Sequence, residues 1–321
     1  MQGLVTVFGG SGFVGGQVVR ALAKAGYRVR VAVRQPNLAY RMRMLGDVGQ
    51  IEVVQANVRV PSSVARALDG AEACVNLVGV LWESGRQKFQ SIHAMGARNV
   101  AEAAAKAGVK RLVHVSAIGA DVNAKAKYAR SKGEGEAVVR AAFPGATIVR
   151  PSIVFGPEDD FFNRFAQMAA LAPVMPLVGG DTKFQPVFVG DVAAVIANAV
   201  ASPAAVGVTY ELGGPTVYTM REILELILTE TGRNRPLLPV PWPLAGLIGS
   251  LGDLQASILP LAPPLTTDQV EMLRDDNVAD HGLPGLAEAG VAPTAVEAVV
   301  PTYLYRYRKG GQYAETPAGA F

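Results

Sequence analysis

Cysteine and histidine are scarce in this chain, which has one cysteine and three histidines in 321 residues. A single cysteine excludes an internal disulfide, and the apolar run around Cys74 predicts a buried side chain. No His or Cys pair stands at the spacing of a metal site, so we expect no bound metal. Uninterrupted apolar runs are also lacking, because prolines and Asp253 break the most apolar tract, residues 236–265. A membrane-spanning helix needs about 20 such residues, and we expect none here.

Charge is low as well. Charged residues make up 18% of the chain and hydrophobic residues 50%, with a mean hydropathy of +0.25. A soluble domain usually has about 25% charged residues, so we expect part of the surface to face another protein or a membrane. The net charge is only +3, and no basic cluster is interleaved with aromatic residues, which disfavours a nucleic-acid-binding protein.

A cluster of glycines dominates what the sequence does contain. The apolar run that ends at Phe8 leads directly into Gly9 and Gly10, which suit a sharp turn off a strand. Gly12 lets a backbone approach phosphate groups, and Gly15 lets a following helix lie close to the strand. This order of strand, turn and helix predicts a dinucleotide-binding site.

Apolar residues at helical spacing follow the glycines, at Val14, Val18 and Leu22. The first N–H groups of a helix have no partner within it, and the helix dipole is positive there, so an anion is stabilised. We therefore expect a pyrophosphate at this turn, contacted by Gly9, Gly12, Phe13, Val14 and Gly15.

Strand and helix patterns alternate over the first half of the chain, which predicts βαβ units and a parallel sheet. Further strands are expected at 29–33, 51–55, 73–78, 111–116 and 147–150, and helices at 94–107 and 131–142. The fold class is a doubly wound α/β core of the Rossmann type over 1–156. Residues 157–321 are expected to form a smaller, mainly helical domain, from which 184–204 return a strand and a helix to the core.

Basic residues end the second predicted strand. A carboxylate there would bind a ribose 2′-hydroxyl, but the strand ends at Arg34, with Arg30 on the same face and no carboxylate nearby. A guanidinium can hold a 2′-phosphate with two hydrogen bonds. The pattern favours NADPH over NADH, the alternative being that Arg34 is a solvated charge at the strand end.

A serine, a tyrosine and a lysine form a constellation typical of reductases. Ser116 follows the fifth predicted strand, and Tyr128 and Lys132 stand four residues apart, on one face of a helix. A free phenol has a pKa of about 10, and a neighbouring Lys⁺ lowers it. Lys132 could also hold a nicotinamide ribose, and Ser116 could polarise a carbonyl. The alternative is that the three residues only grip the ribose, without turnover.

These residues and the glycine turn resemble the short-chain dehydrogenase/reductase superfamily, of the extended or atypical type. Asn57 stands where the superfamily has an aspartate near the adenine, and Val78-Gly79 where an Ala-Gly turn is common. The resemblance implies further cofactor contacts from Asn57, Val58, Leu77, Val78 and Gly79, and from Pro151 at a strand exit near the nicotinamide.

More specific stretches run through the rest of the chain, at 150–159, 161–165, 185–193, 210–215, 265–270 and 276–277. In this order they resemble the nucleotide-binding accessory subunit of respiratory complex I, the alpha-subcomplex subunit 9 family. The resemblance implies a tightly held NADPH with a structural role, outside the path of electrons from NADH to quinone. It also implies partners among the other subunits of the peripheral arm and the membrane junction, near the quinone site.

Two segments agree with such a partner surface. The tract 236–265 and the aromatic, basic end 303–309 suit a protein interface, and the cations also suit anionic lipid headgroups. The alternatives are core helices and a solvated tail. Because no presequence precedes the first strand, we expect a bacterial member, peripheral on the cytoplasmic side of the inner membrane, or on the matrix side if the protein is mitochondrial.

Three carboxylates can be interpreted either as structural or as functional residues. Asp191 is expected to cap a helix rather than contact a ligand, and Glu158 and Asp159 to be solvated or capping rather than an acid/base pair. The competing function for the whole chain is a stand-alone NADP-dependent reductase or epimerase-like enzyme, acting on a quinone precursor or a lipid-linked substrate. The intact Ser116, Tyr128 and Lys132 motivate it.

Overall fold

The computed structural model describes residues 2–258 and 261–313, and it divides into two compact units. The first, called the sheet unit, comprises Met1–Pro151, Gly190–Leu212 and Asp280–Ala292. The second unit comprises Ser152–Val189, Gly213–Ala279 and Pro293–Phe321. The chain therefore returns to the sheet unit twice, whereas the sequence suggested one return, over 184–204.

A seven-stranded sheet, parallel throughout, forms the centre of the sheet unit, in the order β11-β6-β5-β4-β1-β2-β3. The strands are β1 (Gln2–Phe8), β2 (Tyr27–Val33), β3 (Ile51–Gln55), β4 (Ala73–Asn76), β5 (Arg111–Val115), β6 (Thr147–Pro151) and β11 (Thr209–Leu212). Central residues such as Val5, Val7 and Val29 are fully buried, as expected of parallel strands covered on both faces. The predicted doubly wound class is confirmed.

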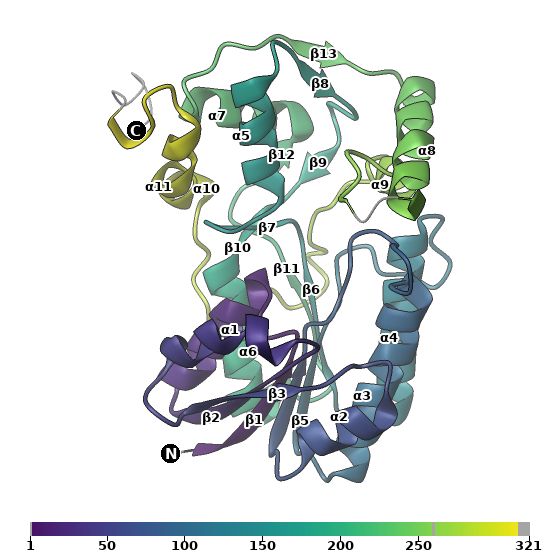
Figure 1. The fold of residues 1–321 in the computed structure, drawn as a ribbon, viewed down its shortest axis with the longest axis vertical. Helices are drawn as coiled ribbons and strands as arrows, with labels where there is room; N and C mark the ends of the chain where they lie inside the picture. Colours follow the sequence, from purple (N-terminus) through teal and green to yellow (C-terminus); the bar gives the residue numbers. More distant parts are fainter. Residues whose placement is uncertain (1, 259–260, 314–321) are drawn as a thin grey trace. The chain divides into compact units, whose positions relative to one another are not determined.

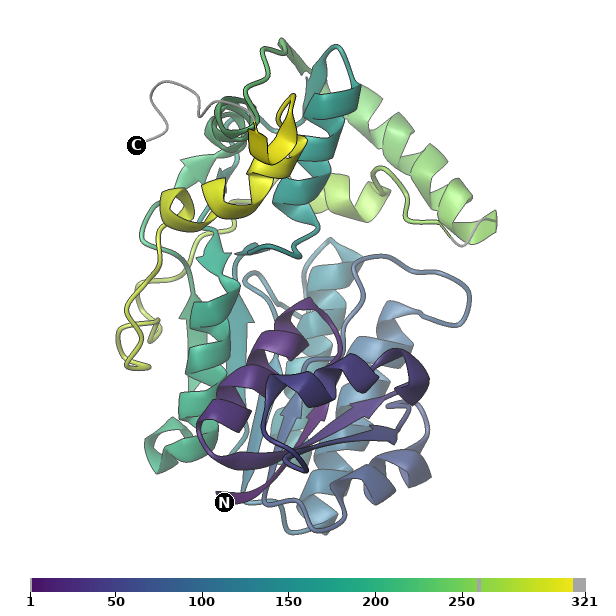
Figure 2. The same ribbon diagram turned by 60° about the vertical axis from the view of Figure 1, so that its left-hand side comes forward.

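Helices cover both faces of this sheet (Figure 1). One face carries α1 (Phe13–Lys24) and α6 (Val189–Ala201), which lie side by side in Figure 2 as well. The other carries α2 (Pro61–Leu68), α3 (Met95–Lys106) and α4 (Lys127–Ala142), which pack against one another in sequence order. A π-helical turn, Gln90–Ala94, precedes α3. Short apolar residues of α2 and α3 pack on the sheet together with Phe8, Cys74 and Leu112, and the predicted burial of Cys74 is confirmed.

Several element boundaries differ from those predicted. β4 ends at Asn76 rather than residue 78, so residues 77–79 form a loop, and α4 begins at Lys127 rather than residue 131. The edge strand β11 was not predicted. Of the segment expected to return to the core, α6 joins the sheet unit, but the strand β10 (Val187–Phe188) pairs with β7 (Val154–Phe155) in the second unit.

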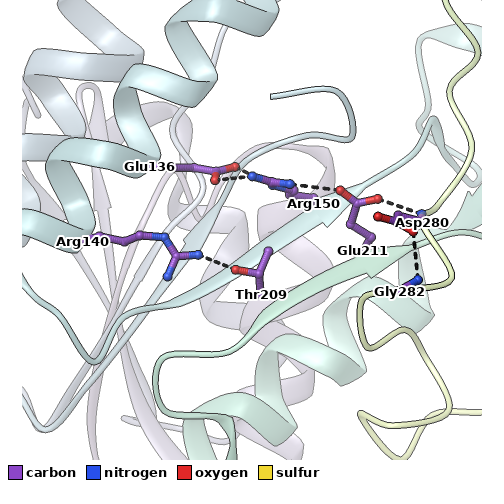
Figure 3. A network of polar contacts seen from close by, with 7 residues as sticks. All are labelled: Glu136, Arg140, Arg150, Thr209, Glu211, Asp280 and Gly282. Atoms are coloured by element: carbon purple, nitrogen blue, oxygen red, sulfur yellow. Dashed lines mark hydrogen bonds and ion pairs between the residues drawn. The ribbon is translucent and has the colours of Figure 1, made fainter. Parts of the chain in front are cut away.

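An ion-pair network secures the β11 edge (Figure 3). The Arg150 guanidinium on β6 donates to Glu136 on α4 at 2.8 and 2.7 Å and to Glu211 on β11 at 3.1 Å. The second oxygen of Glu211 accepts the backbone N–H of Asp280 at 2.9 Å. Beside it, Arg140 donates to the Thr209 hydroxyl. The Arg150–Glu211 pair thereby connects α4, β6, β11 and the segment that begins at Asp280.

The second unit is mainly helical, with small paired strands. Its helices are α5 (Phe161–Leu171), α7 (Met220–Glu230), α8 (Trp242–Ile258), α9 (Thr267–Met272), α10 (Val296–Val299) and α11 (Pro301–Leu304). Its other strand pairs are β9 (Lys183–Phe184) with β12 (Tyr218–Thr219), and β8 (Met175–Leu177) with β13 (Leu237–Pro239). Its core joins α5 and α7 to the last helices through Phe162, Ile223 and Leu304.

Helix α8 has two contrasting apolar faces. Small residues face inward, and a Cβ at Gly252 or Gly249 would collide with backbone of residues 265–267. The opposite face is exposed and consists of Leu244, Leu247, Leu251, Leu254 and Ile258, with exposed fractions of 48–70%. The tract 236–265 is therefore core on one face only. In the part of the chain that the structure describes, no helix combines the length and apolar character needed to cross a bilayer.

The aromatic, basic end packs inside the second unit. The buried Tyr303 hydroxyl donates to Asp159 at 2.6 Å, Arg306 donates to the Pro157 carbonyl at 3.1 Å, and Arg308 pairs with Glu230 at 3.3 Å. Asp159 is buried and accepts backbone N–H groups, whereas Glu158 is exposed. Glu158 is thus solvated and Asp159 binds backbone N–H groups next to α5, as expected of the two carboxylates. Tyr305 and Lys309 are exposed, and a partner or lipid contact of this end stays a prediction. Asp191 lies inside the first turn of α6 rather than before it.

Candidate nucleotide site

Three glycines after β1 have three different physical roles. Gly9 has φ +79°, a left-handed conformation that side chains disfavour. A Cβ at Gly15 would lie 2.3 Å from the Gly9 carbonyl oxygen, so the close contact of α1 with the turn requires glycine. A Cβ at Gly12 would meet only that oxygen, at 3.5 Å, an ordinary contact. The protein's own packing therefore does not require glycine at position 12, which fits the close approach of a ligand.

The start of α1 is suited to an anion. Gly12 is its N-cap, and no side chain caps it. The sheet order changes direction at β1, with β2 and β3 on one side and β4, β5 and β6 on the other. Ligands of open α/β sheets bind at the carboxyl ends of strands at such a reversal. A Cβ on Gly9 would lie 3.2 Å from the Leu77 carbonyl carbon, so the turn after β1 and the loop after β4 (Leu77, Val78 and Gly79) are adjacent.

The two arginines of β2 have different roles. Arg30 pairs with Glu52 at 3.1 Å and donates to the carbonyls of Ala67 and Asp69 at 3.0 and 2.6 Å. The expectation of no carboxylate near this face was therefore wrong for Arg30, because the neighbouring strand β3 supplies one. Arg34 is exposed and donates to the Gln87 side chain at 2.9 Å.

Asn57 and Val58 follow β3 and shape its exit. The Asn57 side-chain oxygen accepts the backbone N–H of Arg59 at 3.1 Å, and the Val58 carbonyl accepts the Asn99 amide at 2.8 Å. The Val58 side chain is buried. These contacts fix the loop at the same sheet edge as the glycine turn.

Lys132 and Tyr128 lie on one face of α4, as predicted from their spacing. The Lys132 ammonium lies 5.8 Å from the Tyr128 ring centroid and donates to the Val115 carbonyl at 3.2 Å. A Cβ on Gly79 would lie 3.4 Å from the same ammonium. Burial lowers the pKa of Lys132 to about 8, and the nearby Glu136 carboxylate opposes this shift. The cation therefore persists at neutral pH beside the phenol.

Two buried histidines, not identified from the sequence, surround this lysine. The Nε2 atom of His93 accepts the Val80 N–H at 3.0 Å, so Nδ1 carries the proton and donates to the Ser131 hydroxyl at 2.8 Å. Ser131 in turn donates to the Tyr128 carbonyl at 2.7 Å. Burial, reinforced by Lys132, lowers the pKa of His93 to about 2.

His114 is the second neutral histidine near Lys132. Burial, again reinforced by Lys132, lowers its pKa to about 3. Its Nδ1 atom lies 3.1 Å from the Asn76 amide nitrogen, which is the donor of that pair. Both imidazoles are thus neutral at physiological pH, and Lys132 is the only cation of this cluster.

Ser116 presents an unused hydroxyl. Its backbone N–H donates to the Val149 carbonyl at 2.7 Å, but within the described residues its buried Oγ has no partner. Pro151 ends β6 and accepts the Ile118 N–H at 3.1 Å. A buried polar atom without a partner is costly, and the carboxamide or carbonyl of a ligand would satisfy it. Together with the open side of Gly12, this hydroxyl fits a nicotinamide dinucleotide.

Comparison with known proteins identifies the family of this chain. Residues 5–213 match the model of the NAD dependent epimerase/dehydratase family. Over 308 residues the chain is 37% identical to the mitochondrial NADH dehydrogenase (ubiquinone) 1 alpha subcomplex subunit 9 of Rattus norvegicus, covering 95% of this chain and 80% of the relative. The chain belongs to the NADH dehydrogenase alpha subcomplex subunit 9 family. The resemblance deduced from the sequence motifs is confirmed.

The chain is also similar to a protein outside the subunit 9 family over most of its length. The ceramide reductase of Caulobacter vibrioides is 33% identical over 257 residues, which cover 80% of each chain. A solved NADPH-dependent quinone oxidoreductase from Escherichia coli, complexed with NADPH, superimposes with a TM-score of 0.72, covering 94% of this chain and 99% of the other at 22% identity. That likeness establishes the shared fold. The assignment of individual residues to a cofactor stays a prediction.

Proposed function

We propose that this subunit 9 family member is an accessory subunit of NADH:quinone oxidoreductase that binds NADPH and stabilises the assembled complex. The observation that carries this proposal is the 37% sequence identity to the Rattus norvegicus subunit over 95% of this chain. The exposed apolar face of α8 supports a partner in the assembly, because surfaces of this kind mark interaction sites. We infer a peripheral position near the membrane junction, on the cytoplasmic side in a bacterium or the matrix side in a mitochondrion.

The cofactor would be held along the carboxyl edge of the sheet. Gly9, Gly12, Phe13, Val14 and Gly15 would bind its pyrophosphate, and Arg34 its 2′-phosphate. Asn57 and Val58 would contact the adenine, and Leu77, Val78 and Gly79 the middle of the molecule. Ser116, Tyr128, Lys132 and Pro151 would surround the nicotinamide half. Bound there, NADPH would supply a hydride donor, whereas the structural role requires only that it stays in place.

The test is a gentle membrane solubilisation with this subunit tagged, followed by size fractionation and identification of the co-purifying chains and the released nucleotide. We expect co-migration with the other subunits of NADH:quinone oxidoreductase, and NADPH that is not oxidised during turnover. A free monomer or homo-oligomer with exchangeable NADP would overturn the proposal.

A reductase acting on a lipid-linked substrate is the second candidate. The likeness to the Caulobacter vibrioides ceramide reductase favours it, as does the intact arrangement of Tyr128 beside the cationic Lys132. In that case Tyr128 would supply the proton to a substrate carbonyl. Steady NADPH consumption by the purified chain with a lipid carbonyl substrate, lost in Tyr128→Phe, would establish this function instead.

A further inference from the structure

A tight turn in the loop after β4 stands against two arginines of the sheet edge. In this turn, residues 84–87, Ser84 N–H donates to the Gln87 carbonyl at 3.1 Å and Gln87 N–H to the Ser84 carbonyl at 2.8 Å. Gly85 supplies the left-handed conformation, with φ +50°. The turn is thus closed by its own backbone and presents its last two residues in a fixed geometry.

Arg34 and Arg59 reach consecutive residues of this turn. The Arg34 guanidinium donates to the Gln87 side chain at 2.9 Å, and the Arg59 guanidinium donates to the Arg86 carbonyl at 2.9 Å. The two arginines follow the neighbouring parallel strands β2 and β3, whose ends pair at Val33 and Gln55. Two guanidinium groups therefore converge from separate strands on one short turn.

The carboxylates around these arginines are engaged elsewhere. Glu52 pairs with Arg30 at 3.1 Å. Glu83 accepts the Phe89 N–H at 2.8 Å and lies 4.0 Å from Lys88. Over residues 2–258 and 261–313, the structure shows no carboxylate paired with Arg34, Arg59 or Arg86. The cluster therefore carries positive charge that no nearby side chain balances.

Arg59 also has an unsatisfied donor. Its Nε atom is buried, and no partner for it exists within the described part of the chain. The residue is held in place from both ends: Asn57 fixes its backbone N–H at 3.1 Å, and the turn fixes one guanidinium nitrogen. A buried N–H of this kind costs free energy unless an acceptor arrives, and in a cationic cluster that acceptor is an anionic oxygen.

We propose that Arg59 is a second phosphate-binding residue, which holds, together with Arg34 and against the 84–87 turn, the 2′-phosphate of the bound nucleotide. This inference rests on the proposed binding of a nicotinamide dinucleotide. A 2′-phosphate carries close to two negative charges, and the fixed fork of each arginine can offer it two hydrogen bonds. Arg59 thereby decides between NADPH and NADH, a choice that the sequence assigned to Arg34 alone.

The experiment measures the Kd of the full chain, freed of nucleotide, for four ligands: NADPH, NADH, adenosine 2′,5′-bisphosphate and 5′-AMP. The variants are Arg59→Gln and Arg34→Gln, with Arg28→Gln as a matched control on the exposed surface of β2. We expect Arg59→Gln to weaken NADPH and the bisphosphate by roughly 10- to 100-fold, the loss of a charged hydrogen bond, and to leave NADH and 5′-AMP unchanged. Arg28→Gln should leave all four unchanged.

The outcomes separate this inference from the proposed function. If the wild-type chain prefers the 2′-phosphorylated ligands and Arg59→Gln keeps that preference, the role of Arg59 is overturned and NADPH binding stands. If the wild-type chain binds none of the four ligands, the proposed function itself has failed. Arg59→Lys adds a check on folding and geometry: it should retain NADH binding and recover part of the lost preference, because a single ammonium replaces the fork.

Discussion

Replacing Gly12 tests the nucleotide site with the least disturbance of the protein itself. Its backbone has φ −79° and ψ −179°, a conformation open to any residue, and a Cβ there makes only one ordinary contact, at 3.5 Å. We expect Gly12→Val to fold, at a cost of no more than about 0.5–2 kcal/mol because valine is a poorer N-cap residue than glycine, and the added Cβ meets no atom closer than 3.5 Å. The methyl groups of the valine would stand where the pyrophosphate approaches, and NADPH should be lost.

Two neighbouring glycines provide controls of opposite sign. A Cβ at Gly16, inside α1, meets nothing within 4 Å, so Gly16→Ala should keep the cofactor and stabilise the helix by roughly 0.5–1 kcal/mol. A Cβ at Gly15 would lie 2.3 Å from the Gly9 oxygen and 2.7 Å from the Gly10 Cα, so Gly15→Ala should destabilise the fold with or without nucleotide. Substitutions at Gly12, Gly16 and Gly15 thus separate ligand approach, helix propensity and backbone packing.

The assay is thermal unfolding with and without added NADPH, combined with quantification of the nucleotide that co-purifies. At 100 times its Kd, a ligand stabilises the folded chain by about 2.7 kcal/mol, and wild type and Gly16→Ala should show this gain. Gly12→Val should have a slightly lower Tm than wild type without nucleotide, no gain with NADPH, and no co-purified NADPH. Normal NADPH stoichiometry in Gly12→Val would refute the placement of the site.

Three further predictions concern the sheet unit. Arg150→Leu leaves the buried Glu136 and Glu211 without their arginine partner and should lower the free energy of urea unfolding by about 3–5 kcal/mol. The control Arg140→Leu loses one contact to Thr209 and should lower it by under about 1.5 kcal/mol. Equal losses in the two variants would contradict the role of the network. The pKa values of His93 and His114 are lowered in the folded chain, so below the ordinary histidine pKa of 6.5 only the unfolded chain binds protons at these two residues. The free energy of unfolding should therefore fall by about 3 kcal/mol between pH 6.5 and about pH 5. An unfolding midpoint that does not change over this range would contradict the burial of two neutral histidines. Under the accessory role, Tyr128→Phe should leave assembly and NADH:quinone activity unchanged, and defective assembly in this variant would argue against it.

The first six strands could be predicted because their signals are local. Each is an apolar run bounded by turn residues, as Ile51–Gln55 is, and the helices between them imply a parallel sheet. The strand β11 has no such signal, because Thr209–Leu212 is short and carries Glu211, which reads as a surface residue. Glu211 is buried only because Arg150, 61 positions away, supplies its counter-charge. That contact is created by the fold and is absent from any window of sequence.

The same distinction divides the candidate site. Tyr128 and Lys132, and the glycines of the first turn, are encoded by spacing within a few residues, so the sequence alone predicts them as site residues. His93 contacts Ser131 across 38 positions, and a lone histidine in an apolar helix gives no indication of such a role. Arg59 shows even less in sequence, where it is one basic residue after a strand. Its place depends on the 84–87 turn, which both Arg59 and Arg34 contact.

The candidate site has more chemistry than a purely structural cofactor would need. Holding a ribose requires hydrogen bonds but not the tuned surroundings of Lys132, where two histidines are kept neutral and the ammonium remains charged next to a phenol. Tyr128 lies on the same helix face, with the ammonium 5.8 Å from its ring centroid, and from this arrangement we predict that Tyr128 can transfer a proton. The absence of turnover in a subunit 9 protein would therefore have to come from substrate access rather than from a lost catalytic group. Mutations that enlarge access should then be able to restore reductase activity, whereas further changes to Ser116, Tyr128 or Lys132 should not.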